Sequence, residues 1–157
     1  MKRFDKAPEM ILMIGIPGSG KSTFCQRNFS HHRLISLDIF HTRHQENEML
    51  LETVTAGWSC VIDNTNVTKA ERAKYIIAAK AAGYRVIGYY FRSRIDECLV
   101  RNAQRSGKKR IPDAGVIGRA QLLELPEYAE GFDELYYVFI EDGNFAIDGW
   151  EVPQCGK

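Results

Sequence analysis

Eight residues near the beginning of the chain, Gly15 to Ser22, fit the pattern Gly-x4-Gly-Lys-Ser. In a loop of this kind the glycines turn backbone amides toward an anion, the lysine reaches the β- and γ-phosphates of a nucleotide, and the serine hydroxyl binds Mg²⁺. We therefore expect ATP to bind with its phosphates in this loop and Mg²⁺ beside them. The residues expected to hold the nucleotide are Gly15, Pro17, Gly18, Ser19, Gly20, Lys21, Ser22 and Thr23.

A chance glycine-rich turn is the alternative interpretation of this pattern. The apolar run 10–16 leads into the loop, and a helical pattern follows it from Gly20 to about Phe29. A phosphate-binding loop needs a strand before it and a helix after it, because the helix N-terminus adds positive potential. The context therefore favours a phosphate-binding loop, with Thr23 placed to hold the α-phosphate.

A single carboxylate, Asp38, follows the apolar run 34–37. It is expected at the carboxyl end of a second strand, which is the edge of a parallel sheet where ligands bind. There Asp38 can orient a hydroxyl group and accept its proton as that group attacks the γ-phosphate, which is the step that a kinase requires. The alternative is that Asp38 merely caps the N-terminus of the next helix.

The segment Asp63-Asn64-Thr65-Asn66 follows another apolar run. A carboxylate at this place in a phosphate-binding protein commonly supports Mg²⁺ or its water shell. Ser22 and Asp63 are therefore the predicted metal ligands. Two alternatives remain open: an Asx-turn that begins the next loop, or contact of Asp63, Asn64 or Asn66 with the phosphate acceptor.

The segment 101–110 is strongly basic and contains no acid. Its five cations are Arg101, Arg105, Lys108, Lys109 and Arg110. Arg101 and Arg105 lie four residues apart and share a helix face. They can supply guanidinium charge as negative charge spreads over the γ-phosphate oxygens. We predict a lid over about residues 101–118, with Arg101 and Arg105 as catalytic candidates. A solvated basic loop and a nucleic-acid tether outside the catalytic site are the alternatives.

Apolar runs alternate with helical patterns along the chain, which predicts βαβ units and a mostly parallel sheet. Strands are expected near 10–15, 34–37, 59–63, 85–91 and 135–140, and helices over about 20–29, 42–56, 68–82 and from 93 onward. The last strand is followed by a turn and a further apolar stretch, which predicts a closing hairpin with an antiparallel edge. The expected fold class is α/β: a P-loop NTPase with three layers, a doubly wound sheet with helices on both faces, a short lid and a C-terminal β-hairpin.

Three local features of this arrangement are also predicted. Thr68 and Glu71 have the spacing of a capping box, in which each side chain bonds the other residue's backbone amide. Ile95 and Cys98 are expected on the apolar face of the helix that begins near 93. An exposed Trp150 in the closing hairpin would indicate an interface edge.

The 157 residues are expected to form a single domain, 1–157. Net charge is +1, with 45% hydrophobic and 26% charged residues, which disfavours wholesale disorder. A nucleic-acid substrate stays possible because binding depends on the local arrangement of cations. The apolar runs are too short to cross a bilayer, and we expect no membrane partner and no signal peptide. The four cysteines lie far apart and predict reduced thiols in a cytoplasmic protein, not a zinc cluster.

Taken together, these motifs resemble the polynucleotide 5′-hydroxyl kinase family. The resemblance covers about residues 10–140 and rests on the Gly15–Ser22 loop, Asp38, Asp63-Asn64-Thr65-Asn66, Arg101-Asn102-x-x-Arg105 and Pro126-x4-Glu130-Gly131-Phe132-Asp133. It implies an adenylate-kinase-like P-loop fold with ATP as the phosphate donor. It also implies Lys21 and Ser22 at the phosphates and Mg²⁺, Asp38 as general base, and Arg101 or Arg105 as the lid arginine.

One position departs from the pattern of that family. An arginine commonly lies three residues after the catalytic aspartate and holds the acceptor's phosphate, whereas here that position is His41, with Arg43 two residues further on. Histidine is a weaker, pH-dependent contact for an anion. Either Arg43 substitutes from a shifted helix, or the acceptor lacks this phosphate, as a nucleoside, sugar or other small alcohol would.

The function expected from the sequence is ATP- and Mg²⁺-dependent phosphoryl transfer to the 5′-hydroxyl end of DNA or RNA. A kinase of a small-molecule alcohol on the same scaffold is the first alternative. A nucleotide-binding module or regulatory ATPase, in which Asp38 does not serve a kinase, is the second.

Overall fold

The central strands form where the chain runs continuously apolar, because a strand buried on both faces of a sheet needs no polar side. In the computed structural model, which describes residues 6–152, the strands are β1 (Glu9–Ile14), β2 (Arg33–Ile35), β3 (Cys60–Ile62), β4 (Arg85–Phe91), β5 (Glu134–Glu141) and β6 (Asn144–Gly149). The helices are α1 (Lys21–Asn28), α2 (Leu37–Phe40), α3 (Arg43–Ala56), α4 (Lys69–Ala81), α5 (Ile95–Ala103) and α6 (Asp113–Leu122). Short 3-10 turns lie at Gly107–Lys109 and Tyr128–Glu130. Each predicted strand is present, with small shifts of its ends.

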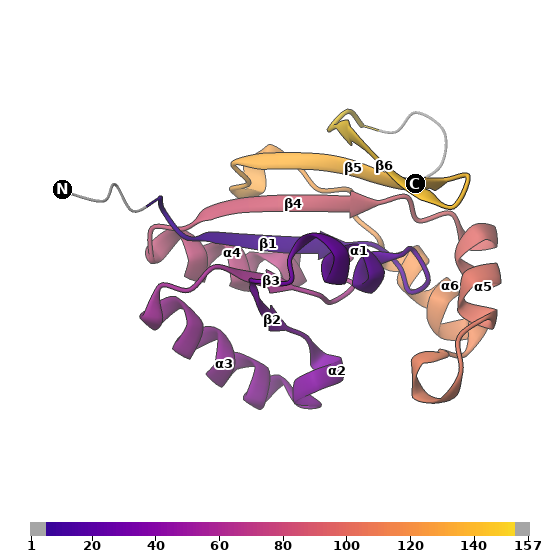
Figure 1. The fold of residues 1–157 in the computed structure, drawn as a ribbon, viewed down its shortest axis with the longest axis horizontal. Helices are drawn as coiled ribbons and strands as arrows, with labels where there is room; N and C mark the ends of the chain where they lie inside the picture. The colour runs from indigo at the N-terminus through magenta and orange to yellow at the C-terminus, as the bar shows by residue number, and fades with distance from the viewer. Residues whose placement is uncertain (1–5, 153–157) are drawn as a thin grey trace.

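The strands form one sheet in the order β2-β3-β1-β4-β5-β6 (Figure 1). Strands β1 to β5 pair in parallel, and β6 pairs with β5 in antiparallel fashion. The mostly parallel sheet and its antiparallel edge are therefore confirmed. Trp150, just after β6, is partly buried and lies edge-on against Tyr90, with ring centres 5.3 Å apart. Trp150 thus joins the packing against the sheet and does not mark an interface edge.

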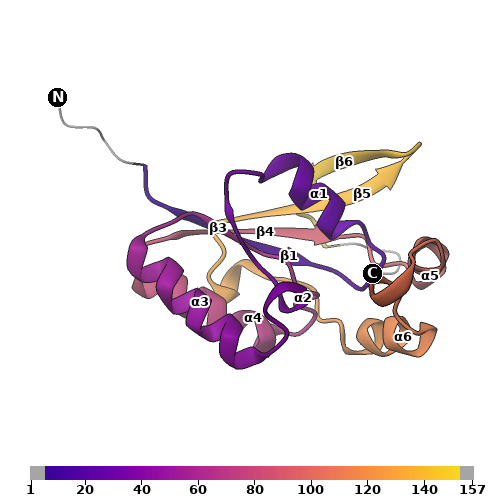
Figure 2. The ribbon, with the colours of Figure 1, turned by 60° about the horizontal axis from the view of Figure 1, so that its bottom comes forward.

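Helices cover both faces of the sheet, as expected for a doubly wound fold. Figure 2 shows α1 on one face and α3 and α4 on the other. On the first face Phe24 of α1 packs in one cluster with Met13. On the second face Leu50 of α3 and Tyr75 of α4 pack in a cluster with Leu12. Helices α5 and α6 lie together beyond the ends of β1 and β4 (Figure 1).

The carboxyl ends of the central strands lie at one edge of the sheet. Leu12 of β1 and Ile35 of β2 are both in register with Ile62 of β3. The amide of Gly15 then donates to the carbonyl of Thr65 at 2.9 Å, which joins the two loops that follow β1 and β3. Because ligands bind at this edge of doubly wound sheets, the segments that follow these strands are brought together where a site is expected.

Several local predictions differ from the structure. Strand β2 ends at Ile35, and the predicted strand residue Leu37 instead begins the one-turn helix α2. Thr68 does accept a hydrogen bond from the Glu71 amide at 3.1 Å, but the Glu71 carboxylate turns away to Arg119. Ile95 is 40% exposed and does not belong to the apolar face of α5.

The structure tests the predictions about membrane spans and thiols only for residues 6–152. No helix in that range is long and apolar enough to cross a membrane. Cys25, Cys60 and Cys98 are buried free thiols, as expected. Burial raises the pKa of Cys25 and of Cys60 to about 12, so both stay protonated and unreactive. Cys155 lies outside the described residues.

Candidate active site

The phosphate-binding loop between β1 and α1 has a conformation that only glycine tolerates at Gly18. Its φ is 86°, and a Cβ atom there would lie 2.4 Å from the carbonyl oxygen of Cys98 in α5. Arg101, also in α5, donates from Nε to the Gly18 carbonyl at 2.6 Å. Helix α5 therefore packs directly against the loop and fixes its shape.

The start of α1 is open to an anion. Gly20, at the N-cap, has no side chain to satisfy the amides of the first turn, and unsatisfied amides at a helix N-terminus favour a phosphate group. Ser22 and Thr23 are exposed on this turn. The amide of Gly15 donates to the carbonyl of Thr65, so in this structure it is not free for a phosphate, and the place of Gly15 at the nucleotide stays a prediction. The role of Thr23 at the α-phosphate stays a prediction.

Lys21 is buried in the loop, with 7% of its surface exposed. Its ammonium group donates to the carbonyl of Ile16 at 3.0 Å and to Oγ of Ser19 at 3.3 Å. Burial lowers the pKa of Lys21 from its ordinary value of 10.5 to about 8, although the Asp63 carboxylate acts in the opposite direction. A phosphate group would replace the missing solvation of this cation, so the loop fits the nucleotide that the motif implies.

Ser22 and Asp63 meet as the metal hypothesis requires. The Ser22 hydroxyl donates to Oδ2 of Asp63 at 2.8 Å. Hard oxygen atoms of this kind suit Mg²⁺, which is usually held by one or two protein oxygens together with substrate phosphates and water. Among residues 6–152, no group of three or more His, Cys, Asp or Glu side chains is arranged to hold a metal.

Asp38 lies in the first turn of α2. Ser36, not Asp38, caps this helix, because its side-chain oxygen accepts from the Asp38 amide at 3.2 Å. The alternative interpretation of Asp38 as a helix cap is therefore wrong. Its carboxylate is exposed at the cavity described next, where it is available to a ligand.

A cavity of about 180 Å³ lies between the phosphate-binding loop, α2, the 63–66 loop and the lid. Nine predicted site residues line it, namely Pro17, Lys21, Ser22, Asp38, Arg43, Asp63, Asn64, Asn66 and Arg105. Parallel strands deliver Lys21, Asp38 and Asp63 to one edge of the sheet, although these residues are far apart in the sequence. The arrangement places a carboxylate opposite a phosphate-binding loop, as hydroxyl activation beside a nucleotide requires.

His41 and Arg43 differ in their relation to the cavity. His41 ends α2 in a left-handed conformation with φ 62°, and it is not among the lining residues. Arg43 begins α3 and does line the cavity. Of these two residues, Arg43 is therefore the one placed to contact a ligand in the cavity, and its role toward an acceptor phosphate stays a prediction.

The two asparagines predicted as acceptor contacts are occupied within the protein. Asn66 is 2% exposed and donates to the carbonyl of Met13 at 2.8 Å. Asn64 accepts from the Leu37 amide at 3.0 Å through Oδ1, and its Nδ2 donates to Glu46 at 2.7 Å. Both residues border the cavity, but their amides hold the surrounding loops in place.

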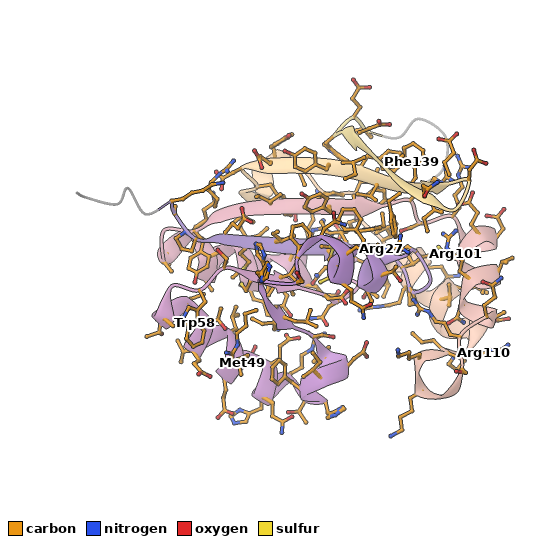
Figure 3. All side chains as sticks on the ribbon, in the orientation of Figure 1. Arg27, Met49, Trp58, Arg101, Arg110 and Phe139 are labelled. Atoms are coloured by element: carbon orange, nitrogen blue, oxygen red, sulfur yellow. The ribbon has the colours of Figure 1, made fainter. Side chains whose placement is uncertain are left out.

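The two lid arginines occupy different places in the structure. Arg105 lines the cavity, whereas Arg101 lies against the phosphate-binding loop, near the α5 end of the molecule in Figure 3. Between them, buried Asn102 bonds both the amide and the carbonyl of Ile111, at 3.1 and 2.6 Å. Asn102 thus closes the base of the basic loop, and Arg110 stands at its exposed surface (Figure 3).

Arg119 also lines the cavity and was not predicted from the sequence. Its guanidinium donates to both carboxylate oxygens of Glu71, at 2.9 and 3.3 Å, and to Oγ1 of Thr65 at 3.1 Å. No local motif marks Arg119, because it reaches the cavity only through the packing of α6. Its position on the helix that follows the basic segment 101–110 is the one sequence signal that could have suggested it.

Comparison with known proteins agrees with this geometry. The family model AAA_33, described as an AAA domain, matches residues 10–124. Transcription factor bHLH140 of Arabidopsis thaliana is 31% identical over 152 residues, covering 86% of this chain. A putative bifunctional polynucleotide phosphatase/kinase of Acanthamoeba polyphaga mimivirus is 32% identical over 136 residues, covering 81%. The chain spans 16% and 32% of the lengths of these two relatives.

Among solved structures, a gluconokinase from Sinorhizobium meliloti aligns with a TM-score of 0.59 and 18% identity, covering 85% of this chain and 83% of the gluconokinase. A structural similarity at this low sequence identity shows a shared fold and nothing more. The family model covers most of the chain, and the loop between β1 and α1 is the phosphate-binding feature that such a fold carries. The chain therefore belongs to the AAA_33 family of AAA domains and has the fold of the P-loop kinases.

Proposed function

We propose that this chain transfers the γ-phosphate of ATP, in the presence of Mg²⁺, to the 5′-hydroxyl end of DNA or RNA. The observation that carries the proposal is that Asp38 shares one cavity with Lys21, Ser22 and Asp63. A switch or motor ATPase needs no carboxylate placed to receive the proton of an alcohol, whereas a kinase does.

Each lining residue has a distinct part in this chemistry. When bound, ATP with Mg²⁺ supplies the phosphoryl group and neutralises part of its charge. Ser22 and Asp63 would hold the metal, and Lys21 would hold phosphate oxygens. Asp38 orients the attacking hydroxyl and accepts its proton. Arg105 supplies positive charge where negative charge grows during transfer.

Two features support nucleic acid as the acceptor. Arg43 lines the cavity near Asp38, where a guanidinium can hold the phosphate that follows a 5′-terminal nucleoside. The lid residues Lys108, Lys109 and Arg110 are exposed and can meet further phosphates along a strand. Relatives named polynucleotide phosphatase/kinase add weight to this acceptor class.

A small-molecule alcohol is the second candidate acceptor. The cavity of about 180 Å³ is small, and the fold is shared with a gluconokinase. A sugar or nucleoside would need no basic track outside the cavity. The two candidates therefore differ in salt dependence, because only a strand that releases counterions binds more weakly as salt is raised.

Transfer of γ-labelled phosphate from ATP to 5′-hydroxyl DNA and RNA oligonucleotides tests the proposal. The assay includes Lys21→Ala and Asp38→Ala as inactive variants, each expected to lose at least about a hundredfold in rate. Asp148→Ala, an exposed carboxylate of β6, is the matched control and should keep its activity. Labelling of a sugar or nucleoside alone, insensitive to salt, would establish the second candidate instead. ATP hydrolysis without labelling of any alcohol would refute both.

A further inference from the structure

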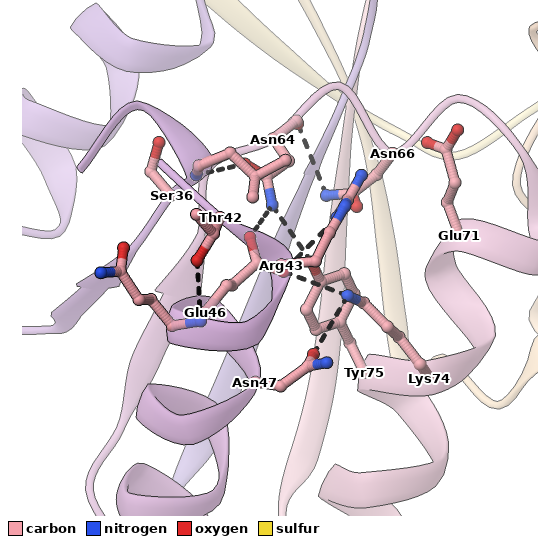
Figure 4. Close-up of polar contacts among 12 residues, drawn as sticks. Ser36, Thr42, Arg43, Glu46, Asn47, Asn64, Asn66, Glu71, Lys74 and Tyr75 are labelled. Carbon is pink, nitrogen blue, oxygen red and sulfur yellow. Dashed lines mark hydrogen bonds and ion pairs between the residues drawn. The ribbon is translucent and has the colours of Figure 1, made fainter. Parts of the chain in front are cut away.

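Glu46 of α3 is a fully buried carboxylate beside the acceptor side of the cavity. None of its surface is exposed, and four side chains donate hydrogen bonds to it (Figure 4). Tyr75 donates from its hydroxyl, and the other three donate from nitrogen: Asn64 Nδ2 at 2.7 Å, Lys74 Nζ at 3.1 Å and Arg43 Nη1 at 3.5 Å. Glu46 itself is not among the residues that line the cavity.

A carboxylate is costly to bury, and its donors here explain how it stays charged. Burial alone would raise the pKa of Glu46, but the hydrogen bonds from Tyr75, Asn64 and Lys74 hold that pKa below its usual range. An apolar residue would fill the same place without needing four polar partners. The buried charge acts on two neighbours that border the cavity, Asn64 and Arg43.

The first consequence of Glu46 is the orientation of the Asn64 amide. A charged carboxylate only accepts hydrogen bonds, so Nδ2 of Asn64 must face it. Oδ1 of Asn64 is thereby turned to accept from the amide of Leu37, at 3.0 Å. Leu37 is the first residue of α2 and directly precedes Asp38. Glu46 thus fixes, through one amide group, the turn that carries the proposed general base.

The second consequence of Glu46 concerns Arg43. The Arg43 guanidinium lies 3.5 Å from Oε1 of Glu46, one turn along the same helix. About half of the Arg43 side chain is exposed, and it lines the cavity. Its anchor at Glu46 therefore restricts where the guanidinium can meet an acceptor. A single buried carboxylate connects the two acceptor-side residues of the cavity.

We propose that Glu46 is a positioning residue that holds Asp38, through Asn64 and Leu37, and Arg43 in the geometry needed to receive the acceptor. This inference rests on the proposed function. It assigns Glu46 to the acceptor half of the site and leaves the nucleotide half, formed by the loop between β1 and α1, independent of it. Loss of the Glu46 charge should therefore lower kcat/KM for the acceptor and leave the Kd for ATP nearly unchanged.

The substitution Glu46→Gln tests the proposal with little change in volume. The side-chain amide of Gln at position 46 can donate to Asn64, and Asn64 would turn over to accept this bond. Nδ2 of Asn64 would then face the backbone amide of Leu37, so that two donors meet. We expect kcat/KM for the acceptor to fall about thirtyfold or more, with the Kd for ATP changed less than about threefold. Tyr75→Phe, which leaves the Asn64 bond to Glu46 in place, should show a smaller loss of the same kind.

A loss of stability alone would not lower kcat/KM for the acceptor while leaving the Kd for ATP unchanged. The matched control is Glu130→Gln, since Glu130 is the partly buried partner of the fully buried Arg72 and lies away from the cavity lining. It should lower the melting temperature while leaving kcat/KM for the acceptor within about threefold of the original. Glu46→Gln and Glu130→Gln are both assayed well below their melting temperatures.

A second readout needs no substrate. Hydrogen exchange at the Leu37 amide should become faster in Glu46→Gln and stay unchanged in Glu130→Gln. Unchanged exchange at Leu37 in folded Glu46→Gln protein would overturn the proposal, as would equal losses toward ATP and acceptor. If the original protein phosphorylates no alcohol, the proposed function is refuted. Faster exchange at Leu37 in Glu46→Gln would in that case still support the structural link between Glu46 and the α2 turn.

Discussion

The hydroxyl of Ser22 donates a 2.8 Å hydrogen bond to the Asp63 carboxylate, which ties the start of α1 to the loop after β3. These residues lie 41 positions apart in the sequence and meet because β1 and β3 are neighbouring parallel strands. An Mg²⁺ ion bound beside the phosphates would sit where both oxygen atoms can reach it or its water shell.

Asp63→Asn should raise the Mg²⁺ concentration needed for half-maximal transfer by about tenfold or more, because an amide oxygen is a weaker ligand than a carboxylate. ATP binding measured without metal should change little. The titration is repeated with Asp148→Asn, which removes an equal charge on the exposed surface of β6. An unchanged Mg²⁺ requirement in Asp63→Asn would remove Asp63 from the metal site.

The buried ammonium of Lys21 predicts a pH dependence of nucleotide binding. Its pKa is lowered to about 8 by burial, and a bound phosphate favours the charged form and raises that pKa again. Above pH 8 the free protein has lost the proton that the complex holds, so binding takes up a proton. Affinity for ATP should fall by about tenfold per pH unit above about 8, until the pKa of the complex is reached.

Calorimetric titrations in two buffers of different ionisation enthalpy measure this proton uptake directly. Lys21→Arg is the control, because arginine keeps its charge throughout this range and its weaker binding should not vary with pH in the same way. Proton release above pH 8, or affinity that is constant between pH 7 and 9.5, would contradict the prediction.

The sequence predicted the central strands β1, β3 and β4 well because they are buried on both faces of the sheet. Such strands are continuous apolar runs, which stand out in the sequence without knowledge of their partners. The one-turn helix α2 was missed because four residues are too few for a helical period to appear. Ile95 was misplaced for a related reason: a helix only two to three turns long gives few positions from which to judge its buried face.

The site was predicted where motifs mark it and missed where packing creates it. Lys21, Asp38 and Asp63 each follow a strand, so the parallel arrangement alone brings them together. Glu71 shows the limit of this approach. Its spacing from Thr68 predicted a local capping bond, but its carboxylate bonds Arg119, 48 residues away, and a bidentate arginine is the stronger partner.

Arg101 and Arg105 should have separable effects when each is changed to alanine. Arg105 lines the cavity, so its loss should lower kcat by about a hundredfold or more with a small effect on the Kd for ATP. Arg101 holds the Gly18 carbonyl of the phosphate-binding loop, so its loss should weaken ATP binding as well. Binding and single-turnover rates of both variants check this division. The reverse pattern would assign the charge-stabilising role to Arg101.

Arg119 should contribute to transfer through its own charge and not only through its bond to Glu71. Arg119→Ala removes a guanidinium from the cavity lining and should lower kcat by about tenfold or more. Glu71→Gln leaves that guanidinium in place, and the Thr68 cap accepts from the backbone amide of residue 71, which the substitution keeps. This variant should therefore stay within about threefold of the original rate.

The comparison of these two variants separates catalysis from structure. If Arg119 served only to join α6 to α4, breaking the pair from either side would cost a similar amount, and the two variants would lose activity equally. Arg92→Ala is the matched control, because Arg92 also pairs with a glutamate, Glu97, but does not line the cavity. It should change stability slightly and leave kcat intact. A loss confined to Arg119→Ala would place Arg119 of α6, in addition to Arg105, among the groups that act on the phosphate.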